Sequence, residues 1–180
     1  MLRKEDISVD LTNKLSVQNY ALGKAIEGVR LIEFDFHVDD GGDFHEIARI
    51  KNGVISSLED FELKQINRSR FNPGLIKAFH LHFKQDEVWA VHPLDRLLVG
   101  LLDTRKGSKT ERAQMRVILG GGKSRLLYIP RGVAHGGAVL GRRPVDVLYL
   151  VNENFSSTDP DEWRLPWNLL GEEFWQVNRA

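Results

Sequence analysis

Cysteine is absent from the 180 residues of this chain. Its absence excludes disulfides, thiolate zinc sites, iron–sulfur clusters and cysteine nucleophiles. An excess of charge is also absent, because 25 lysines and arginines balance 25 aspartates and glutamates. Nucleic acids and anionic membranes attract basic surfaces, so this neutral chain is expected to bind neither of them.

Long apolar runs are lacking as well. No run approaches the length of a membrane span, and the first ten residues, MLRKEDISVD, contain no apolar segment like that of a signal peptide. The simplest expectation is a soluble protein of the cytoplasm.

The size and composition are those of an ordinary globular protein. A chain of 180 residues defaults to one domain, and 42% hydrophobic with 28% charged residues is typical of a folded protein. We expect an N-terminal extension over residues 1–27, a barrel over 28–155 and a C-terminal packing segment over 156–180.

Short apolar runs with an alternating pattern dominate the sequence, and glycine or proline separates most of them. For example, Phe34, Phe36 and Val38 fall on one face of an extended strand. Many short strands at such spacing predict a β-sandwich or barrel. A closed sheet leaves an interior that can hold one small ligand.

Two separated blocks contain histidines at fixed spacing. In the first, Gly74 precedes His80, His82 and Glu87, and two histidines that lie two apart on a strand point to the same side. In the second, a Pro-x-Gly turn leads His135 into the next run. The blocks G-x5-H-x-H-x4-E and P-x-G-x-x-H resemble the two signatures of the cupin barrel. We therefore predict an all-β cupin fold (a double-stranded β-helix, or jelly-roll barrel) with short helices and an irregular C-terminal segment.

The resemblance narrows to one family through five segments that recur in the same order: residues 65–69, 74–80, 102–110, 128–136 and 148–149. From about Val38 to Trp167 the chain resembles the dTDP-4-dehydrorhamnose 3,5-epimerase family. The resemblance implies a dimeric cupin of sugar-nucleotide metabolism, with its copies joined through the N-terminal strands. It also implies carbohydrate biosynthesis of the dTDP-rhamnose kind, a nucleotide-linked keto-sugar as the small-molecule substrate, and no cofactor.

The family's chemistry is proton exchange at carbons next to a ketone. This chemistry needs a base on one face of the sugar, an acid on the other, and a donor for the developing enolate oxygen. By resemblance, His80 is the base and Tyr149 is the acid. Gln65, Asn67 and His135 correspond to residues that line the site.

The chain departs from the family at two positions that hold phosphate. Gly42 occupies the position of a phosphate-binding arginine in the family, and Lys77 replaces the arginine that usually precedes the base. Lysine is a point charge rather than a bidentate fork, so it would hold a diphosphate less specifically. Arg68 and Arg70 lie beside Asn67, on the approach to the strand with His80, and are the natural replacements.

Further departures concern the reacting groups. The family's enolate-steadying lysine aligns near Val88, and Lys84 is the lysine close to it in sequence. A second family tyrosine aligns with Phe155, and the C-terminal aspartate that pairs with the base has no clear match.

Two other functions are open at this point. His80, His82, Glu87 and His135 make up the three-histidine, one-carboxylate set of metal cupins, which would bind one divalent transition metal such as Fe, Mn, Ni, Cu or Zn. A third possibility is a non-catalytic relative that only binds a sugar.

Several of these residues also have a purely structural interpretation. His80 and His82 can be satisfied interior histidines, Tyr149 a core tyrosine, and Glu87 a solvated turn residue. The block over 103–110 is best interpreted as a structural turn in which the aspartate caps backbone and hydroxyl groups.

Overall fold

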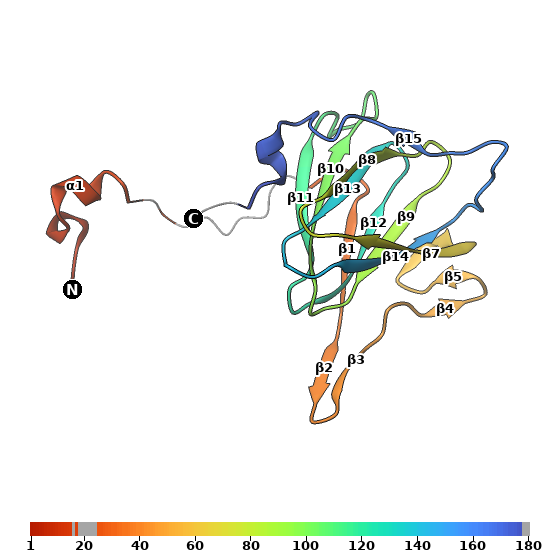
Figure 1. Ribbon diagram of the computed structural model, residues 1–180, viewed down its shortest axis with the longest axis horizontal. Coiled ribbons are helices and arrows are strands. Elements are labelled where there is room, and N and C mark those ends of the chain that lie inside the picture. Colours follow the sequence, from red (N-terminus) through yellow and green to blue (C-terminus); the bar gives the residue numbers. More distant parts are fainter. Residues whose placement is uncertain (16, 18–24, 178–180) are drawn as a thin grey trace.

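A computed structural model describes residues 1–15, 17 and 25–177, and most of its regular elements are antiparallel strands (Figure 1). Two five-stranded sheets form the barrel. The first contains, in spatial order, β1 (Arg30–Phe34), β12 (Ser124–Ile129), β9 (Glu87–Val91), β14 (Val145–Val151) and β7 (Gln65–Phe71). The second contains β11 (Gln114–Gly120), β10 (Arg96–Asp103), β13 (Val133–Val139), β8 (Ile76–Leu81) and β15 (Trp163–Arg164). The all-β prediction is confirmed.

The remaining elements are short. They are the hairpin β2 (Phe36–Asp39) with β3 (Gly42–His45), the small sheet of β4 (Ile50–Lys51), β5 (Val54–Ile55) and β6 (Leu58–Glu62), and the helices η1 (Lys4–Asp6), α1 (Val9–Thr12) and η2 (Glu172–Trp175). None of the described helices is long and apolar enough to cross a membrane. Only part of the predicted N-terminal extension lies within the described residues, and η1 and α1 bury no side chain.

The core lies between the two sheets because inward-facing aliphatic side chains alternate along each strand. Leu97, Val99 and Leu101 of β10 meet Leu127 of β12 and Val147 of β14 there, and all five are buried. Where the cavity opens, side chains of β7 and β8 that line it are polar instead, among them Gln65, Asn67 and His80.

The first sheet is covered on its outer face as well. Val88 and Ala90 of β9 point away from the barrel interior and pack with Leu58 and Phe61 of β6. Burial on both faces explains why every residue of β9 is buried. As a result, Glu87 and Trp89, which point into the barrel, are held on a rigid strand.

The C-terminal segment packs on the outer face of the second sheet. Phe174 and Trp175 of η2 are buried against Phe79, and the backbone of β10 approaches them so closely that a Cβ atom at Gly100 would lie 2.5 Å from Phe174. Glycine is therefore required at this position of β10.

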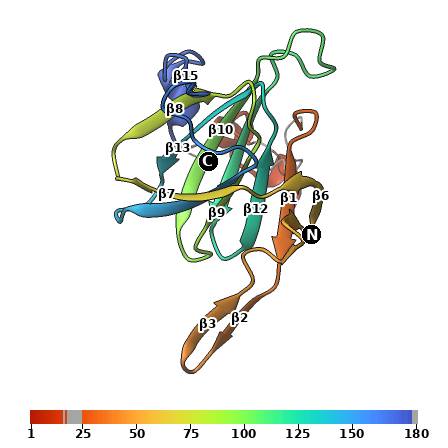
Figure 2. The same cartoon turned by 90° about the vertical axis from the view of Figure 1, so that its right-hand side faces the viewer.

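The β2–β3 hairpin extends away from the barrel, as both ribbon views show (Figures 1 and 2). It exposes Val38 and Phe44, with 72% and 69% of their surfaces accessible. Gly42 lies on this hairpin and is exposed.

Candidate active site

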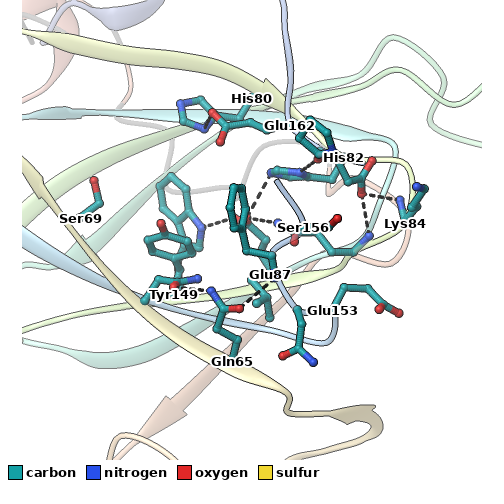
Figure 3. Close-up of a pocket in the computed structure, with 18 of the residues that line it drawn as sticks. Gln65, Ser69, His80, His82, Lys84, Glu87, Tyr149, Glu153, Ser156 and Glu162 are labelled. Carbon is teal, nitrogen blue, oxygen red and sulfur yellow. Dashed lines mark hydrogen bonds and ion pairs between the residues drawn. The ribbon is translucent and has the colours of Figure 1, made fainter. Parts of the chain in front are cut away.

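A cavity of about 580 Å³ opens between the two sheets, and it is the size of a site for a small organic ligand. Strands of both sheets and the segment 153–162 line it (Figure 3). Its lining includes most of the residues expected at the site, namely Gln65, Asn67, Lys77, His80, His82, Lys84, Glu87 and Tyr149.

The predicted base and acid enter this cavity from different sheets. His80 lies on β8 of the second sheet, and Tyr149 lies on β14 of the first. Across the ladders, His80 pairs with His135 of β13, and Tyr149 pairs with Trp89 of β9 and Asn67 of β7. A ligand in the cavity thus has an imidazole on one side and a phenol on the other.

His80 is neutral and its Nε2 atom is already engaged. An Arg164 Nη1 atom lies 2.7 Å from Nε2. Because guanidinium groups only donate, Nε2 accepts, and the proton is on Nδ1. Burial, followed by the charges of His135 and Arg164, lowers the pKa of His80 to about 3. Arg164 must leave Nε2 before that atom can accept a proton from a ligand.

The acidic partner of His80 is Glu162, whose Oε1 atom lies 3.6 Å from His80 Nδ1. Glu162 is also ion-paired with Arg164. Both residues reach His80 because β15 pairs with β8, with Arg164 opposite His80 in the register. Neither residue is predicted from the sequence. The only local signal was a charged stretch, Asp159 to Arg164, within the C-terminal segment.

Tyr149 is available as a proton donor. Burial, then the negative charges of Glu87 and Glu162, raise its pKa, so the phenol keeps its proton at neutral pH. Within the described part of the chain, no residue forms a hydrogen bond with its hydroxyl group. It is therefore half-buried in the cavity wall with a free O–H, which a core tyrosine would not normally leave unused.

Three further residues form a buried cluster at the base of the cavity. His82, Glu87 and His135 are 5%, 4% and 2% exposed. The Nε2 atoms of His82 and His135 each lie 3.1 Å from a different Glu87 oxygen. Burial alone would raise the pKa of Glu87, but the two histidines hold it well below its usual range. The interpretation of Glu87 as a solvated turn residue is thus wrong.

His80 does not belong to this cluster. The ligand atoms of His82, Glu87 and His135 all lie within 4.8 Å of one another, whereas His80 Nε2 is held by Arg164. Of the four residues that the sequence suggested as metal ligands, the structure therefore brings three together. The physical reason is that the pairing of β15 with β8 gives His80 a different partner.

Polar residues of β7 and β8 line another part of the cavity wall. Gln65 Nε2 donates to Asn67 Oδ1 at 2.7 Å, and Gln65 Oε1 accepts from the backbone N–H of Phe155. The Lys77 ammonium donates to Ser69 Oγ at 2.6 Å. These contacts hold the side chains in place and leave their remaining hydrogen-bonding capacity toward the cavity.

Lys84 reaches the cavity rim but is not a free charge. It is ion-paired with Asp159, which raises the pKa of Lys84. Asp161, two residues farther on, accepts hydrogen bonds from three successive backbone N–H groups, those of Phe83, Lys84 and Gln85. The rim is therefore acidic on this side.

Arg68 and Arg70 are not part of the cavity, which corrects the expectation that they replace the missing arginine. Alternation along β7 places them on the opposite face from Asn67, where both are ion-paired with Asp146. Val88 likewise points away from the cavity. It lies in the outer cluster, the group of buried side chains on the outer face of the first sheet that includes Leu58 and Phe61. The neighbouring position that does face inward carries an acid, Glu87.

The block over 103–110 is a structural turn, as predicted. The Asp103 carboxylate accepts from the Arg105 backbone and side chain and from the hydroxyls of Ser108 and Thr110. These hydrogen bonds, opposing the effect of burial, lower its pKa. Gly107, with φ of 78°, supplies the left-handed position of the turn.

Comparison with known proteins places this chain in a family. The family model described as dTDP-4-dehydrorhamnose 3,5-epimerase matches residues 23–168. The spore coat polysaccharide biosynthesis protein SpsL of Bacillus subtilis is 39% identical over 143 residues, which are 79% of this chain and 91% of that protein.

Two solved structures agree with this assignment. The dTDP-4-dehydrorhamnose 3,5-epimerase of Bacillus anthracis, with TDP and PPi bound, is 26% identical with a TM-score of 0.68, covering 84% of this chain and 87% of that one. The dTDP sugar isomerase of Desulfovibrio desulfuricans is 26% identical with a TM-score of 0.69, covering 85% and 91%. The predicted cupin-type fold and the predicted class, a sugar-nucleotide epimerase, are both confirmed. The chain belongs to the dTDP-4-dehydrorhamnose 3,5-epimerase family.

Proposed function

We propose that this protein exchanges protons at a carbon next to the keto group of a nucleotide-linked sugar, with His80 as base and Tyr149 as acid. The observation that carries this proposal is the placement of the two groups on opposite sheets, facing one cavity. Inversion at carbon needs removal of a proton from one face and delivery to the other. The relative from Bacillus anthracis, which has TDP bound, supports a nucleoside diphosphate as the carrier of the sugar.

The reaction divides into two proton transfers. After Arg164 leaves it, His80 Nε2 accepts the proton of the carbon next to the ketone, and the electron pair moves onto the keto oxygen to give an enolate. The Tyr149 hydroxyl then donates its proton to the other face of that carbon, and the ketone re-forms. Exchange with solvent returns the proton from His80 and restores it to Tyr149, so no redox cofactor is needed.

Glu162 assists this sequence as a positioning residue. Its carboxylate lies beside His80 Nδ1, so it stabilises the imidazolium that forms when Nε2 takes up a proton. It also holds Arg164, the cation that must move aside.

The direct test is incubation with a dTDP-linked 4-keto-6-deoxy sugar in D₂O, followed by NMR. We expect deuterium at the carbons that flank the ketone, together with an epimerised product. If the substrate's protons stay unexchanged at enzyme concentrations that bind it, the proposed function is wrong.

The diphosphate is expected to bind weakly, because few cations face the cavity. Arg68 and Arg70 point to the other side of β7, and Lys84 is paired with Asp159, which leaves Lys77 as the main contact. A charge-assisted hydrogen bond contributes about 1.5–3 kcal/mol, so Lys77→Ala should weaken dTDP binding by about 10- to 150-fold in titration calorimetry. Arg68→Ala is the matched control and should leave the affinity unchanged. Tight dTDP binding that ignores Lys77 would contradict this assignment.

We also infer a homodimer of the cytoplasm. The exposed apolar side chains of the projecting β2–β3 hairpin, Val38 and Phe44, support association of two copies. A chain with no cysteine needs no oxidising compartment. Light scattering should give twice the chain mass of 20.5 kDa, and a monomer would contradict the dimer.

A further inference from the structure

In the buried cluster of His82, Glu87 and His135, two polar atoms have no hydrogen-bond partner, namely Nε2 of each histidine. His135 Nδ1 lies 3.0 Å from the carbonyl of Val133, and His82 Nδ1 contacts the carbonyl of Asp161. Carbonyl oxygens only accept, so each Nδ1 atom carries the ring proton. Unless a further cation reaches the cluster, either a second ring proton or a metal ion, each Nε2 atom is then a bare lone pair.

Both Nε2 lone pairs point toward an acceptor. Each lies 3.1 Å from a Glu87 oxygen, yet neither Nε2 atom has a hydrogen-bond partner. The Glu87 oxygens already accept from Trp89 Nε1 at 2.6 Å and Gln85 Nε2 at 2.8 Å. Acceptors that face one another in a buried site destabilise it unless a cation lies between them.

A second group of potential ligands shows the contrast. Asp43, His45 and His92 also bring their ligand atoms together, near the β2–β3 hairpin. There, His92 Nδ1 accepts from the N–H of Leu94, so its Nε2 atom carries the proton and faces Asp43 at 3.2 Å. His92 and Asp43 therefore satisfy each other, and the group is partly exposed, so it does not require an ion.

We propose that His82, Glu87 and His135 bind one divalent transition-metal ion in the floor of the cavity, with His80 outside the ligand set. Their three donor atoms lie within 4.8 Å of one another, and two imidazoles with a carboxylate suit Mn, Fe, Co, Ni, Cu or Zn.

The surroundings of the three residues support the same conclusion. Metal-binding histidines usually donate their other ring N–H to a carbonyl or carboxylate, as both do here. Trp89 and Gln85 orient the carboxylate in the same way. His82 and Glu87 also line the cavity, so positions on the ion would remain open to a ligand.

The proposal adds to the proposed function without depending on it, because metal binding can be measured without substrate. When bound, a divalent ion would polarise a carbonyl oxygen. By the family resemblance a lysine has that role, and here Val88 occupies its aligned position and faces the outer cluster.

The test uses the full-length protein without an affinity tag. Metal analysis of the purified protein, and titration of chelator-treated protein with Co²⁺, Mn²⁺, Fe²⁺, Ni²⁺, Cu²⁺ and Zn²⁺, should give one ion per chain. Glu87→Gln and His82→Ala should weaken binding by at least about 100-fold. His80→Ala and His92→Ala should keep both the stoichiometry and the Co²⁺ absorption spectrum.

Thermal unfolding provides a readout that does not depend on any one variant. An ion that binds only the folded chain raises the midpoint of the parent protein and of His92→Ala, but not that of Glu87→Gln. Absence of binding by every ion tested would overturn the proposal and leave a proton as the cation of the cluster. Loss of binding in His80→Ala would overturn the three-residue ligand set. Neither result would alter the deuterium-exchange test of the proposed function.

Discussion

His80→Asn is expected to lower deuterium exchange into a 4-keto sugar nucleotide by about 10²- to 10⁴-fold, the range that positioned general bases contribute. Asparagine has a similar size and can still pair with Arg164, but its amide cannot accept a proton at neutral pH. NMR in D₂O measures the exchange rate directly. The fold should be preserved, because His80 lines the cavity and is not part of the hydrophobic core.

His92→Asn is the matched control for this substitution. His92 lies outside the cavity, in the group near the β2–β3 hairpin, so the exchange rate should not change. Circular dichroism and thermal unfolding check that both variants are folded. Unchanged exchange in a folded His80→Asn protein would remove His80 as the base.

The pH profile provides an independent readout of the same residue. Because the pKa of His80 is about 3 in the free protein, His80 stays deprotonated as the pH falls from 7 to 5. The kcat/KM for exchange reports ionisations of the free enzyme, so no loss with a midpoint near 6.5 should arise from His80. Arg164→Ala removes one of the charges that lower this pKa and should move the acidic limb to higher pH.

Local patterns in the sequence predicted the parts of the site that lie on one strand or one turn. The two-residue period placed His80 and His82 on the cavity side of one segment, and the turn of the 103–110 block followed from its residue types. These features depend on neighbours in sequence, which a single sequence displays.

Pairings between distant segments were the parts that could not be predicted. Arg164 meets His80 only because β15 adds to the edge of the second sheet beside β8, and no local pattern encodes that register. The position of Arg68 was predicted wrongly because nearness in sequence was taken for nearness in the site. Closeness to Asn67 in sequence suggested the same site, whereas adjacent residues on a strand face opposite sides.

Replacing Tyr149 by Phe separates the two proton transfers. Formation of the epimerised product should fall by about 10²- to 10⁴-fold, because no acid remains on the side of the cavity opposite His80. Removal of the substrate's proton by His80 should continue, since the imidazole is untouched. The expected result is therefore deuterium incorporation into the starting sugar with its configuration retained, observed by NMR in D₂O.

Tyr128→Phe controls for the loss of a phenol as such. Tyr128 is buried in the outer cluster, beneath the guanidinium of Arg30, and does not line the cavity. Its variant should epimerise at the parent rate even if its stability falls. A folded Tyr149→Phe protein that still epimerises at the parent rate would show that another group delivers the proton. Equal loss of exchange and epimerisation would show that Tyr149 acts in the first transfer, and the assignment of base and acid to opposite sheets would have to be revised.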